Sequence, residues 1–379
     1  MWIVWLTGFI LLPVMGIIYV SWHIWELLPL PAMWRGGAVG LLVAAVLLMF
    51  AGFTGVTERM PLAAAKATYE TGNSMTVLLL YLTLAFAVLD LCQWTHLIPR
   101  AWLHDNGYTA MGMACLMALL LGYGYAHYRH KFRQELRLET PKRVSDHIAR
   151  REKKVVLLSD LHLGYHISRR EFARWVDLLN DEHPDLILIG GDIIDISVRP
   201  LLMEGVAREF RCLKAPVYAC LGNHEYYAGE PRARKFYQEA GIVLLRDSVA
   251  VADGITIIGR DDRSNARRTP LRELISHVDH STYVILLDHQ PYHLEEAEQA
   301  GIDFQFSGHT HDGQVWPISW LTSTMYEKSF GYLRKGHTKY YVTSGIGIWG
   351  PKFRLGTRSE YVVATLCQQD GTGTSLSGR

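Results

Sequence analysis

Five short stretches of this chain place carboxylates, imidazoles and an asparagine close together in patterns that can hold metal ions. They are Asp160-x-His162, Gly191-Asp192-x-x-Asp195, Gly222-Asn223-His224-Glu225, Asp288-His289 and Gly308-His309-x-His311. Imidazole nitrogens mixed with carboxylate oxygens suit Mn²⁺, Fe²⁺ or Zn²⁺ rather than Ca²⁺. Two such ions about 4 Å apart can clamp the attacking and leaving oxygens of an in-line displacement. Asp192, midway in the series, is the expected bridge between them.

Each cluster alone has an ordinary structural explanation. Asp-x-His occurs in solvated turns, Gly-Asp-x-x-Asp in helix caps and Gly-Asn-His in tight loops, and His-x-His alone is nonspecific. Here, however, every cluster ends an apolar run that reads as a strand. Sites in α/β sheets form outside the carboxyl ends of the strands, so five clusters in series favour one shared site. Glycines before Asp192, Asn223 and His309 permit the sharp turns that such a site needs.

Residues 153–367 contain the elements that must position these clusters. Buried strands are expected at KVVLLSD, PDLILIGGD and APVYACLGNHE, with helices at RREFARWVDLLNDEH and PLLMEGVAREFRCLK between them. Further strands follow at GITIIG, TYVILLDHQP, IDFQFSGHTH, KYYVTSG and SEYVVATL, with few intervening helices. Strand–helix alternation followed by a strand-rich half predicts an α/β domain with a mixed or double sheet.

The order of the five clusters resembles the calcineurin-like metallophosphoesterase superfamily, whose pattern is D-x-H, GD-x-x-D, GNH-[DE], a lone His and GH-x-H. The resemblance covers about residues 153–367. Within it, GHTHDGQ and SGIGIWGPKFRLG look like the membrane-associated branch of YkuE- and YaeI-type phosphoesterases. The fold it implies is a four-layer α/β/β/α sandwich.

The resemblance also implies a set of site residues and two divalent metal ions, Mn, Fe or Zn. One ion would be held by Asp160, His162, Asp192 and His311, and the other by Asp192, Asn223, His289 and His309. Asp192 and His224 would be catalytic, with His224 contacting the phosphate and protonating the leaving group. Asp195 would orient a ligand or the loop. Arg354 would either supply charge to a phosphate oxygen or serve in packing or a surface salt bridge.

Four apolar runs precede this domain, at 2–22, 36–54, 74–92 and 109–128. Each has about the 20 residues needed to cross a bilayer. Tryptophans near run ends, such as Trp22, Trp34 and Trp94, suit interfacial anchors. Residues 1–128 are therefore expected to form a transmembrane domain of about four helices, with a buried helical core as the alternative. The first run lacks a basic n-region and a cleavage site, which favours a retained span over a signal peptide.

The distribution of Lys and Arg predicts the orientation. Residues 129–152 are expected to be a basic juxtamembrane linker that can contact anionic lipid. The stretch YRHKFRQELR directly after the fourth run carries four basic residues, and the 2–3 connection carries two more, whereas the other two connections carry only Arg35 and Arg100. This predicts a multi-pass protein of the inner or plasma membrane with a cytoplasmic catalytic domain. Five cysteines without Cys-x-x-Cys spacing agree with that compartment. Residues 368–379 are small and polar, which predicts a disordered tail.

The expected function is that of a membrane-bound dinuclear-metal phosphoesterase. It would hydrolyse a phosphodiester, phosphomonoester or pyrophosphate bond by metal-activated hydroxide. Lys and Arg number 38 against 37 Asp and Glu, so no nucleic-acid partner is indicated. Beyond membrane lipids, the partner is a phosphorylated substrate that can be lipid-linked. The segment WPISWLTSTMYEKSF can line a lipid-accepting groove, dip into the membrane interface or simply cover the sheet.

Two alternatives remain at this stage. One is a UDP-2,3-diacylglucosamine-type pyrophosphohydrolase, although the best-known group with that activity has Arg where this chain has His224. The other is a non-catalytic membrane scaffold with a decayed site. The presence of every expected ligand residue argues against this alternative.

Overall fold

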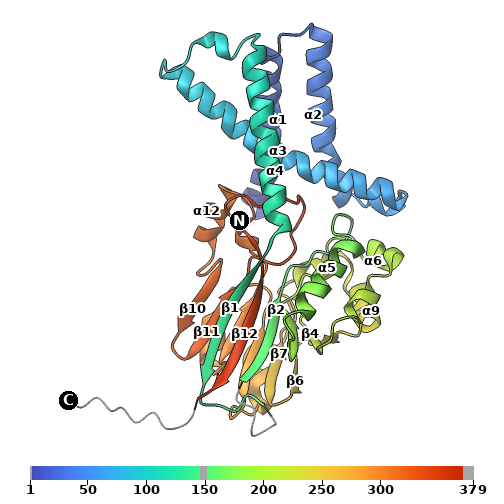
Figure 1. Cartoon of the computed structure of the whole chain (residues 1–379), viewed down its shortest axis with the longest axis vertical. Helices are drawn as coiled ribbons and strands as arrows, with labels where there is room; N and C mark the ends of the chain where they lie inside the picture. Colours follow the sequence, from blue (N-terminus) through green and yellow to red (C-terminus); the bar gives the residue numbers. More distant parts are fainter. Residues whose placement is uncertain (1, 146–151, 370–379) are drawn as a thin grey trace, which may run out of the picture. The chain divides into compact units, whose positions relative to one another are not determined.

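The computed structural model describes residues 2–145 and 152–369, and the chain divides into two compact units (Figure 1). The first unit comprises Met1–Tyr128 and Gly350–Phe353, and the second comprises Arg129–Trp349 and Arg354–Arg379. The expected tail at 368–379 is altered at its start, because the last strand runs to Gln368. Residues 370–379 lie outside the described residues.

The first unit is helical. Its helices are α1 (Trp2–Leu27), α2 (Ala32–Phe53), α3 (Leu62–Trp94) and α4 (Gly107–Arg129), with single turns η1 (Val56–Arg59) and η2 (Arg100–Trp102). Among the described residues, three helical stretches are long and apolar enough to cross a membrane: Ala32–Gly52, Leu62–Trp94 and Gly107–Arg129. In α1 the stretch Leu11–Leu27 is a shorter apolar helix. All four expected runs therefore lie in helices, and three of these helices are candidate spans.

Close backbone approach holds α2 and α3 together. A side chain at Gly72 of α3 would collide with the backbone of α2, 2.7 Å from the Cα of Met49. Small residues permit this kind of helix contact, which drives association where water supplies no hydrophobic force. A polar contact also links α1 to α3, with His23 Nε2 3.0 Å from Asp90 Oδ2. The unit thus combines small-residue packing with a paired polar group, as helices in lipid require.

The second unit contains two six-stranded sheets (Figure 1). The first sheet has the order β1 (Lys131–Thr140), β12 (Ser359–Gln368), β2 (Glu152–Leu158), β3 (Leu186–Ile189), β4 (Val217–Ala219) and β5 (Val243–Leu244). The second has the order β10 (Gly331–Lys335), β11 (Thr338–Val342), β9 (Phe304–Ser307), β8 (Tyr283–Leu287), β7 (Ile255–Gly259) and β6 (Ser248–Ala252).

Helices connect and cover these sheets. Between the strands of the first sheet lie α5 (Arg169–Asn180), α6 (Arg199–Glu204), α7 (Ala207–Phe210), α8 (Asn223–Tyr227) and α9 (Glu230–Ala240). The second half contains α10 (Leu271–Leu274), η3 (Ile275–His277), α11 (Glu295–Gln299), η4 (His311–Gly313) and α12 (Ile318–Met325).

The hydrophobic core fills the space between the sheets and continues beneath the helices. Leu157 and Leu188 of the first sheet pack in one buried cluster with Ile257 and Phe306 of the second. On the outer face of the second sheet, a separate buried cluster joins Leu286, Leu271 and other residues from α10, β8 and α11. On the other side, α5 buries the apolar face expected from its sequence. The expected four-layer α/β/β/α sandwich is therefore confirmed.

The parallel strands bring the polar clusters to one edge of each sheet. In the first sheet, β2, β3 and β4 run parallel, and Asp160, Asp192 and Asn223 follow their carboxyl ends. In the second sheet, β8 and β9 run parallel and are followed by His289 and His309. Each sheet thus contributes part of the candidate site.

The expected linker at 129–152 is wrong for residues 131–140, which form strand β1. This strand pairs in parallel with β12 over ten residues, from Lys131 opposite Ser359 to Thr140 opposite Gln368. Apolar and charged residues alternate along it, and Leu138 is fully buried in the core between the sheets. The period of two that marks a half-buried strand was present in the sequence. The catalytic domain therefore begins before residue 153.

The basic residues of β1 contact carboxylates of the same unit. Arg133 Nε lies 2.7 Å from Glu182 Oε1, and Arg137 Nη2 lies 3.5 Å from Glu152 Oε1. These charges belong to the solvent face of an edge strand, where charged residues discourage pairing with another chain. They give no independent indication of a lipid-contacting linker.

Candidate metal centre

Five of the expected ligands have an unusual backbone conformation. Asp160, His162, Asp192, His309 and His311 all have φ between 46° and 71°, in the left-handed region. Thirteen non-glycine residues in the described part of the chain share this feature. L-residues adopt it at a cost, and such strain concentrates at functional sites. At the strand ends, the conformation turns each side chain out of the strand direction.

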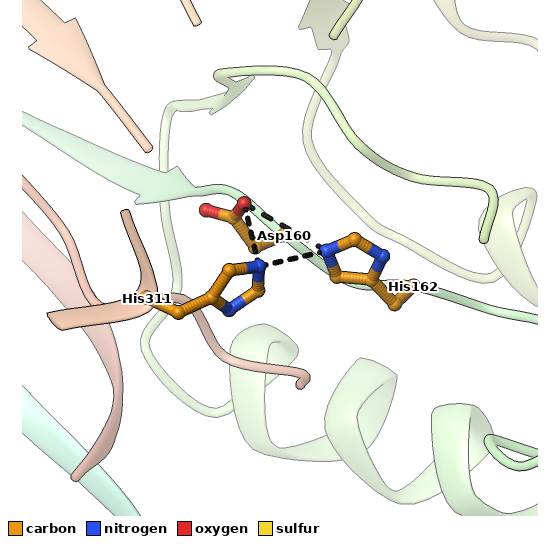
Figure 2. A group of neighbouring side chains, drawn as sticks. All are labelled: Asp160, His162 and His311. Atoms are coloured by element: carbon orange, nitrogen blue, oxygen red, sulfur yellow. Dashed lines mark hydrogen bonds and ion pairs between the residues drawn. The ribbon is translucent and has the colours of Figure 1, made fainter. Parts of the chain in front are cut away.

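Asp160, His162 and His311 form the first group of the site (Figure 2). His311 Nε2 lies 3.0 Å from His162 Nε2 and 3.3 Å from Asp160 Oδ1, and His162 Nε2 lies 3.8 Å from the same oxygen. All three residues are buried. Two imidazole nitrogens and a carboxylate oxygen converging on one point are typical ligands of a divalent transition metal.

The second group is centred on Asp192. Its Oδ2 lies 3.1 Å from His289 Nε2, and Asn223 Oδ1 lies 2.8 Å from His309 Nδ1. The His289 and His309 rings are 5.3 Å apart between centroids. Asp192 Oδ2 is also 3.7 Å from His162 Nε2, in the first group. Asp192 thus faces both groups, as a bridging carboxylate must.

Polar contacts behind the ligands fix which nitrogen faces the site. His289 Nδ1 donates to the carbonyl of Gly190 at 2.7 Å, which leaves Nε2 as the ligand atom. His162 Nδ1 faces Asp195 Oδ1 at 3.3 Å, again leaving Nε2 toward the first group. Such partners set the tautomer and ring orientation of metal-binding histidines. Asp195 thus lies behind His162, on the side away from the first group.

The charges of the site favour bound cations. Burial raises the pKa of Asp160, Asp192 and Asp195, but the surrounding histidines outweigh it and hold all three below their ordinary value. Burial likewise opposes charge on His162 and His289. The carboxylates nevertheless raise the pKa of His162 to about 10 and that of His289 well above its ordinary value. Three buried carboxylates therefore require positive charge at this point.

The donor set fits a pair of divalent metals. It offers imidazole nitrogens, carboxylate oxygens and one amide oxygen, the ligands that Mn²⁺, Fe²⁺ and Zn²⁺ accept. His289 Nε2 is buried and has no hydrogen-bond partner among the described residues, although it faces the Asp192 carboxylate. A cation between these two atoms would satisfy both.

Glu225 secures the loop that carries Asp192, a role that the sequence did not indicate. Its fully buried carboxylate accepts hydrogen bonds from the backbone N–H groups of Asp192 at 3.1 Å, Ile194 at 3.0 Å and Gly222 at 2.7 Å. Burial, together with the nearby Asp192, raises the pKa of Glu225 to about 7. Gly222 must lack a side chain, because a Cβ there would lie 2.7 Å from the Asp192 nitrogen.

His224 begins α8 next to the first group. Its backbone N–H donates to Asp192 Oδ1 at 2.9 Å, and its ring lies edge-on to His162 with centroids 4.5 Å apart. Its Nδ1 is turned to Asp195, 3.3 Å from the carbonyl oxygen and 3.4 Å from Oδ1. Nε2 is therefore the nitrogen that remains for a substrate.

Arg354 does not lie where it can contact a substrate phosphate. It is fully buried, and its guanidinium donates to the carbonyls of His311 at 2.6 Å, Ser344 at 2.5 Å and Gly347 at 3.2 Å. The expectation of a phosphate contact or a surface salt bridge is corrected accordingly. Its donors hold the backbone of the His311 loop, and the packing alternative is the one that agrees with the structure.

The segment after the His-x-His motif does not simply cover the sheet. Trp316 is 57% exposed and Trp320 is 68% exposed, and Ile318, Leu321 and Met325 are exposed as well. We call these five residues the α12 apolar face. Directly after α12, Tyr326 returns to the metal centre, with its ring 6.3 Å from that of His309. The same short segment therefore connects the site with an exposed apolar surface.

A family model agrees with this geometry. The model for calcineurin-like phosphoesterases matches residues 153–313, which include both metal groups from Asp160 to His311.

Similar proteins carry the same designation. The chain is 30% identical over 262 residues to an uncharacterized metallophosphoesterase of Aquifex aeolicus, covering 66% of this chain and 97% of that protein. It is 32% identical over 234 residues to a transmembrane protein with metallophosphoesterase domain of Danio rerio, covering 57% of this chain and 53% of that one. In two other bacterial metallophosphoesterases the chain spans 58% and 60% of their length. A solved structure, the calcineurin-like phosphoesterase YfkN of Bacillus subtilis, is 13% identical with a TM-score of 0.36. The match covers 59% of this chain and 93% of that one.

Proposed function

Because the chain belongs to the calcineurin-like metallophosphoesterase family, we propose that it is a membrane-bound, metal-dependent hydrolase of phosphoric esters. The observation that supports this most is the meeting of five sequence clusters from two sheets around Asp192. Such a constellation binds cations and a phosphoryl group, and an ordinary structural role would not require it.

In this proposal, Asp160, His162 and His311 hold one divalent cation, and Asn223, His289 and His309 hold the other, with Asp192 shared. When bound, two divalent cations neutralise the charge of the phosphoryl group and acidify water in the site. Glu225, Asp195 and Arg354 act by positioning, since each contacts a ligand residue or its loop rather than the open side of the site.

His224 is proposed as the acid for the leaving group. Hydrolysis breaks the bond from phosphorus to the leaving oxygen and forms one to the oxygen of water, so the leaving oxygen needs a proton. The Asp195 carboxylate and carbonyl contact Nδ1 of His224, which orients the ring. The proton on Nε2 can then pass to the leaving oxygen.

We further propose that the substrate resides in or at the bilayer. The support is the α12 apolar face, which begins five residues after His311 and ends next to Tyr326, beside the metal centre. Exposed tryptophans with aliphatic neighbours on a helix partition into membrane interfaces. The same chain has three candidate membrane spans, which would tether the catalytic domain to a bilayer. A pyrophosphate-linked lipid is one substrate of this class.

The test is hydrolysis by the full-length protein in detergent, after metal removal and refilling with Mn²⁺, Fe²⁺ or Zn²⁺ in turn. The panel contains a simple phosphodiester, a phosphomonoester, a phospholipid and a nucleotide-linked lipid. We expect metal-dependent turnover that falls at least about 100-fold in Asp192→Asn and His224→Ala, the range of removing one general acid. Metal binding without turnover on any substrate would favour the scaffold alternative instead.

A further inference from the structure

The segment after β7 contains a concentration of arginines that the metal centre does not use. Residues 260–272 read RDDRSNARRTPLR. Four of the five arginines, at positions 260, 263, 268 and 272, line a cavity of about 590 Å³, together with His293 and one carboxylate, Glu296. We call it the arginine cavity.

Partly buried hydrogen bonds hold this segment in a fixed conformation. Asp247 accepts from the backbone N–H of Asp261 at 2.8 Å and from that of Thr269 at 2.7 Å. Asn265 Nδ2 donates to Asp261 Oδ2 at 2.8 Å, and Gln290 Nε2 donates to both oxygens of Asp262, at 3.1 and 2.9 Å. A wall fixed in this way loses little conformational entropy when a ligand binds.

The arginine cavity has surplus positive charge. Arg260 and Arg268 each form an ion pair with Asp288, with Nη1 3.1 Å from a carboxylate oxygen. Arg260 Nη1 also lies 2.8 Å from Glu296 Oε2. Arg263 and Arg272 are exposed, and neither forms an ion pair within the described part of the chain. Four guanidinium groups thus face two carboxylates. Guanidinium groups bind phosphate oxygens with paired hydrogen bonds, so a phosphate suits this surplus.

Short contacts connect the arginine cavity to the metal centre. Asp288, which pairs with Arg260 and Arg268 of the cavity, directly precedes the candidate ligand His289. The guanidinium of Arg263 lies over the ring of Tyr292, 4.9 Å from its centroid. Tyr292 Oη donates to Tyr326 Oη at 3.1 Å, and Tyr326 lies next to His309. A ligand in the cavity and a phosphoryl group at the metals would therefore be neighbours along the same wall.

We propose that the arginine cavity binds a phosphate group distinct from the one that is cleaved. Three sources can supply this phosphate. It is a second phosphate of the substrate, as in a pyrophosphate diester, the phosphate of a lipid headgroup, or free phosphate. Anion binding at the cavity stands without the proposed hydrolysis; only its assignment to the substrate rests on the proposed function. Arg263 and Arg272 are the groups that reach the ligand, and Arg260 and Arg268 supply fixed charge behind it.

The binding test uses the full-length protein in detergent and inorganic phosphate as the probe, measured by isothermal titration calorimetry. After metal removal, we expect one phosphate site that weakens roughly tenfold or more in Arg263→Ala/Arg272→Ala, the loss of charge-assisted hydrogen bonds. Arg170→Ala/Arg174→Ala removes two exposed arginines from α5 and serves as the matched control. Equal affinity in both double variants, or no metal-independent phosphate site in the wild type, would overturn the proposal.

Kinetics and vesicles then identify the source of the phosphate. If it belongs to the substrate, the Arg263→Ala/Arg272→Ala variant raises KM for a pyrophosphate diester, with kcat and the KM for bis(4-nitrophenyl) phosphate unchanged. If it belongs to a lipid headgroup, the variant also binds phosphatidylcholine vesicles containing phosphatidic acid less tightly, and vesicles without it equally. Unchanged KM and vesicle binding, with phosphate affinity lost, identify free phosphate. If no substrate is hydrolysed, the proposed function fails while the calorimetry still decides on the cavity.

Discussion

The candidate ligands depend on residues that come from other parts of the sequence. The His311 loop is held by Arg354, 43 residues away, whose guanidinium lies in the interior and donates to backbone carbonyls. The Asp192 loop is held by Glu225, 33 residues away. In both cases a buried ionisable side chain hydrogen-bonds to backbone groups that include those of a ligand loop. The geometry of the metal centre is therefore set as much by these two side chains as by the ligands.

Arg354→Lys tests this positioning role. Lysine keeps the charge but lacks the planar fork that reaches three carbonyls at once. We expect the melting temperature of the catalytic domain to fall by roughly 6–12 °C, from about 3 kcal/mol of lost charged hydrogen bonds. Metal content per chain should fall as well, with KM of the remaining active protein unchanged. Differential scanning fluorimetry, metal analysis and steady-state kinetics measure the three quantities.

Arg174→Lys, at an exposed position on α5, is the control and should leave all three quantities as in the wild type. If Arg354→Lys instead raised KM and left the melting temperature unchanged, Arg354 would be a substrate contact after all.

The clusters at Asp160, Asp192 and His309 could be found in the sequence because each is local, with glycine, carboxylate and imidazole within a few residues after an apolar run. Arg354 and Glu225 gave weaker signals. A buried arginine bound to carbonyls looks like any other arginine in a sequence, since its partners are distant along the chain. The arginines of the segment 260–272 were equally visible as letters, but only the fold brings them around one cavity.

At the scale of elements, strands whose faces are both buried were predictable, whereas the partly exposed strands β1, β5, β6 and β10 were not. β3, β8 and the second half of β2 are continuous apolar runs, which the sequence marks plainly. β1 alternates Phe132, Leu136 and Leu138 with polar and charged residues. Because these charges come directly after an apolar run, they favour the interpretation of a basic juxtamembrane linker over that of a strand. Its partner β12 lies more than two hundred residues later, so no local pattern indicates the pairing.

The α12 apolar face gives the prediction at this scale. Replacing Trp316 and Trp320 by Ser removes the two largest exposed apolar groups of the segment. If the face contacts the bilayer, hydrolysis of a substrate embedded in vesicles should fall by roughly tenfold, about 1.4 kcal/mol of lost interfacial contact. Hydrolysis of bis(4-nitrophenyl) phosphate in solution should not change, because both tryptophan side chains are largely exposed, whereas the metal ligands are buried.

Leu202→Ser/Met203→Ser is the matched control, because it removes two similarly exposed apolar residues from α6. It should leave both rates unchanged. An equal loss of the two activities in the tryptophan variant would mean that α12 supports the site itself, and the proposed membrane contact would be abandoned.

At the scale of the whole molecule, the revised fold changes the argument for orientation. Lys131, Arg133 and Arg137 belong to β1 in the catalytic domain, so they no longer count as residues flanking a span. The basic residues that remain next to the spans are Arg59, Lys66 and Arg129 on the predicted cytoplasmic side and Arg35 and Arg100 on the opposite side. The bias keeps its sign but is much smaller, and the cytoplasmic placement of the catalytic domain remains a prediction.

Labelling of Cys212 tests the orientation. This cysteine is exposed on the catalytic domain, whereas Cys220 and Cys367 are buried and Cys115 lies on α4, in a candidate span. With the domain in the cytoplasm, a membrane-impermeant maleimide should label the full-length protein in inside-out vesicles and leave it unlabelled in intact cells. The thiol is also expected to be free in that reducing compartment. Cys212→Ala should abolish the labelling and so assign it to this residue. Labelling of the wild type in intact cells would place the metal centre outside the cytoplasm, where a substrate would have to be supplied from the opposite face of the membrane.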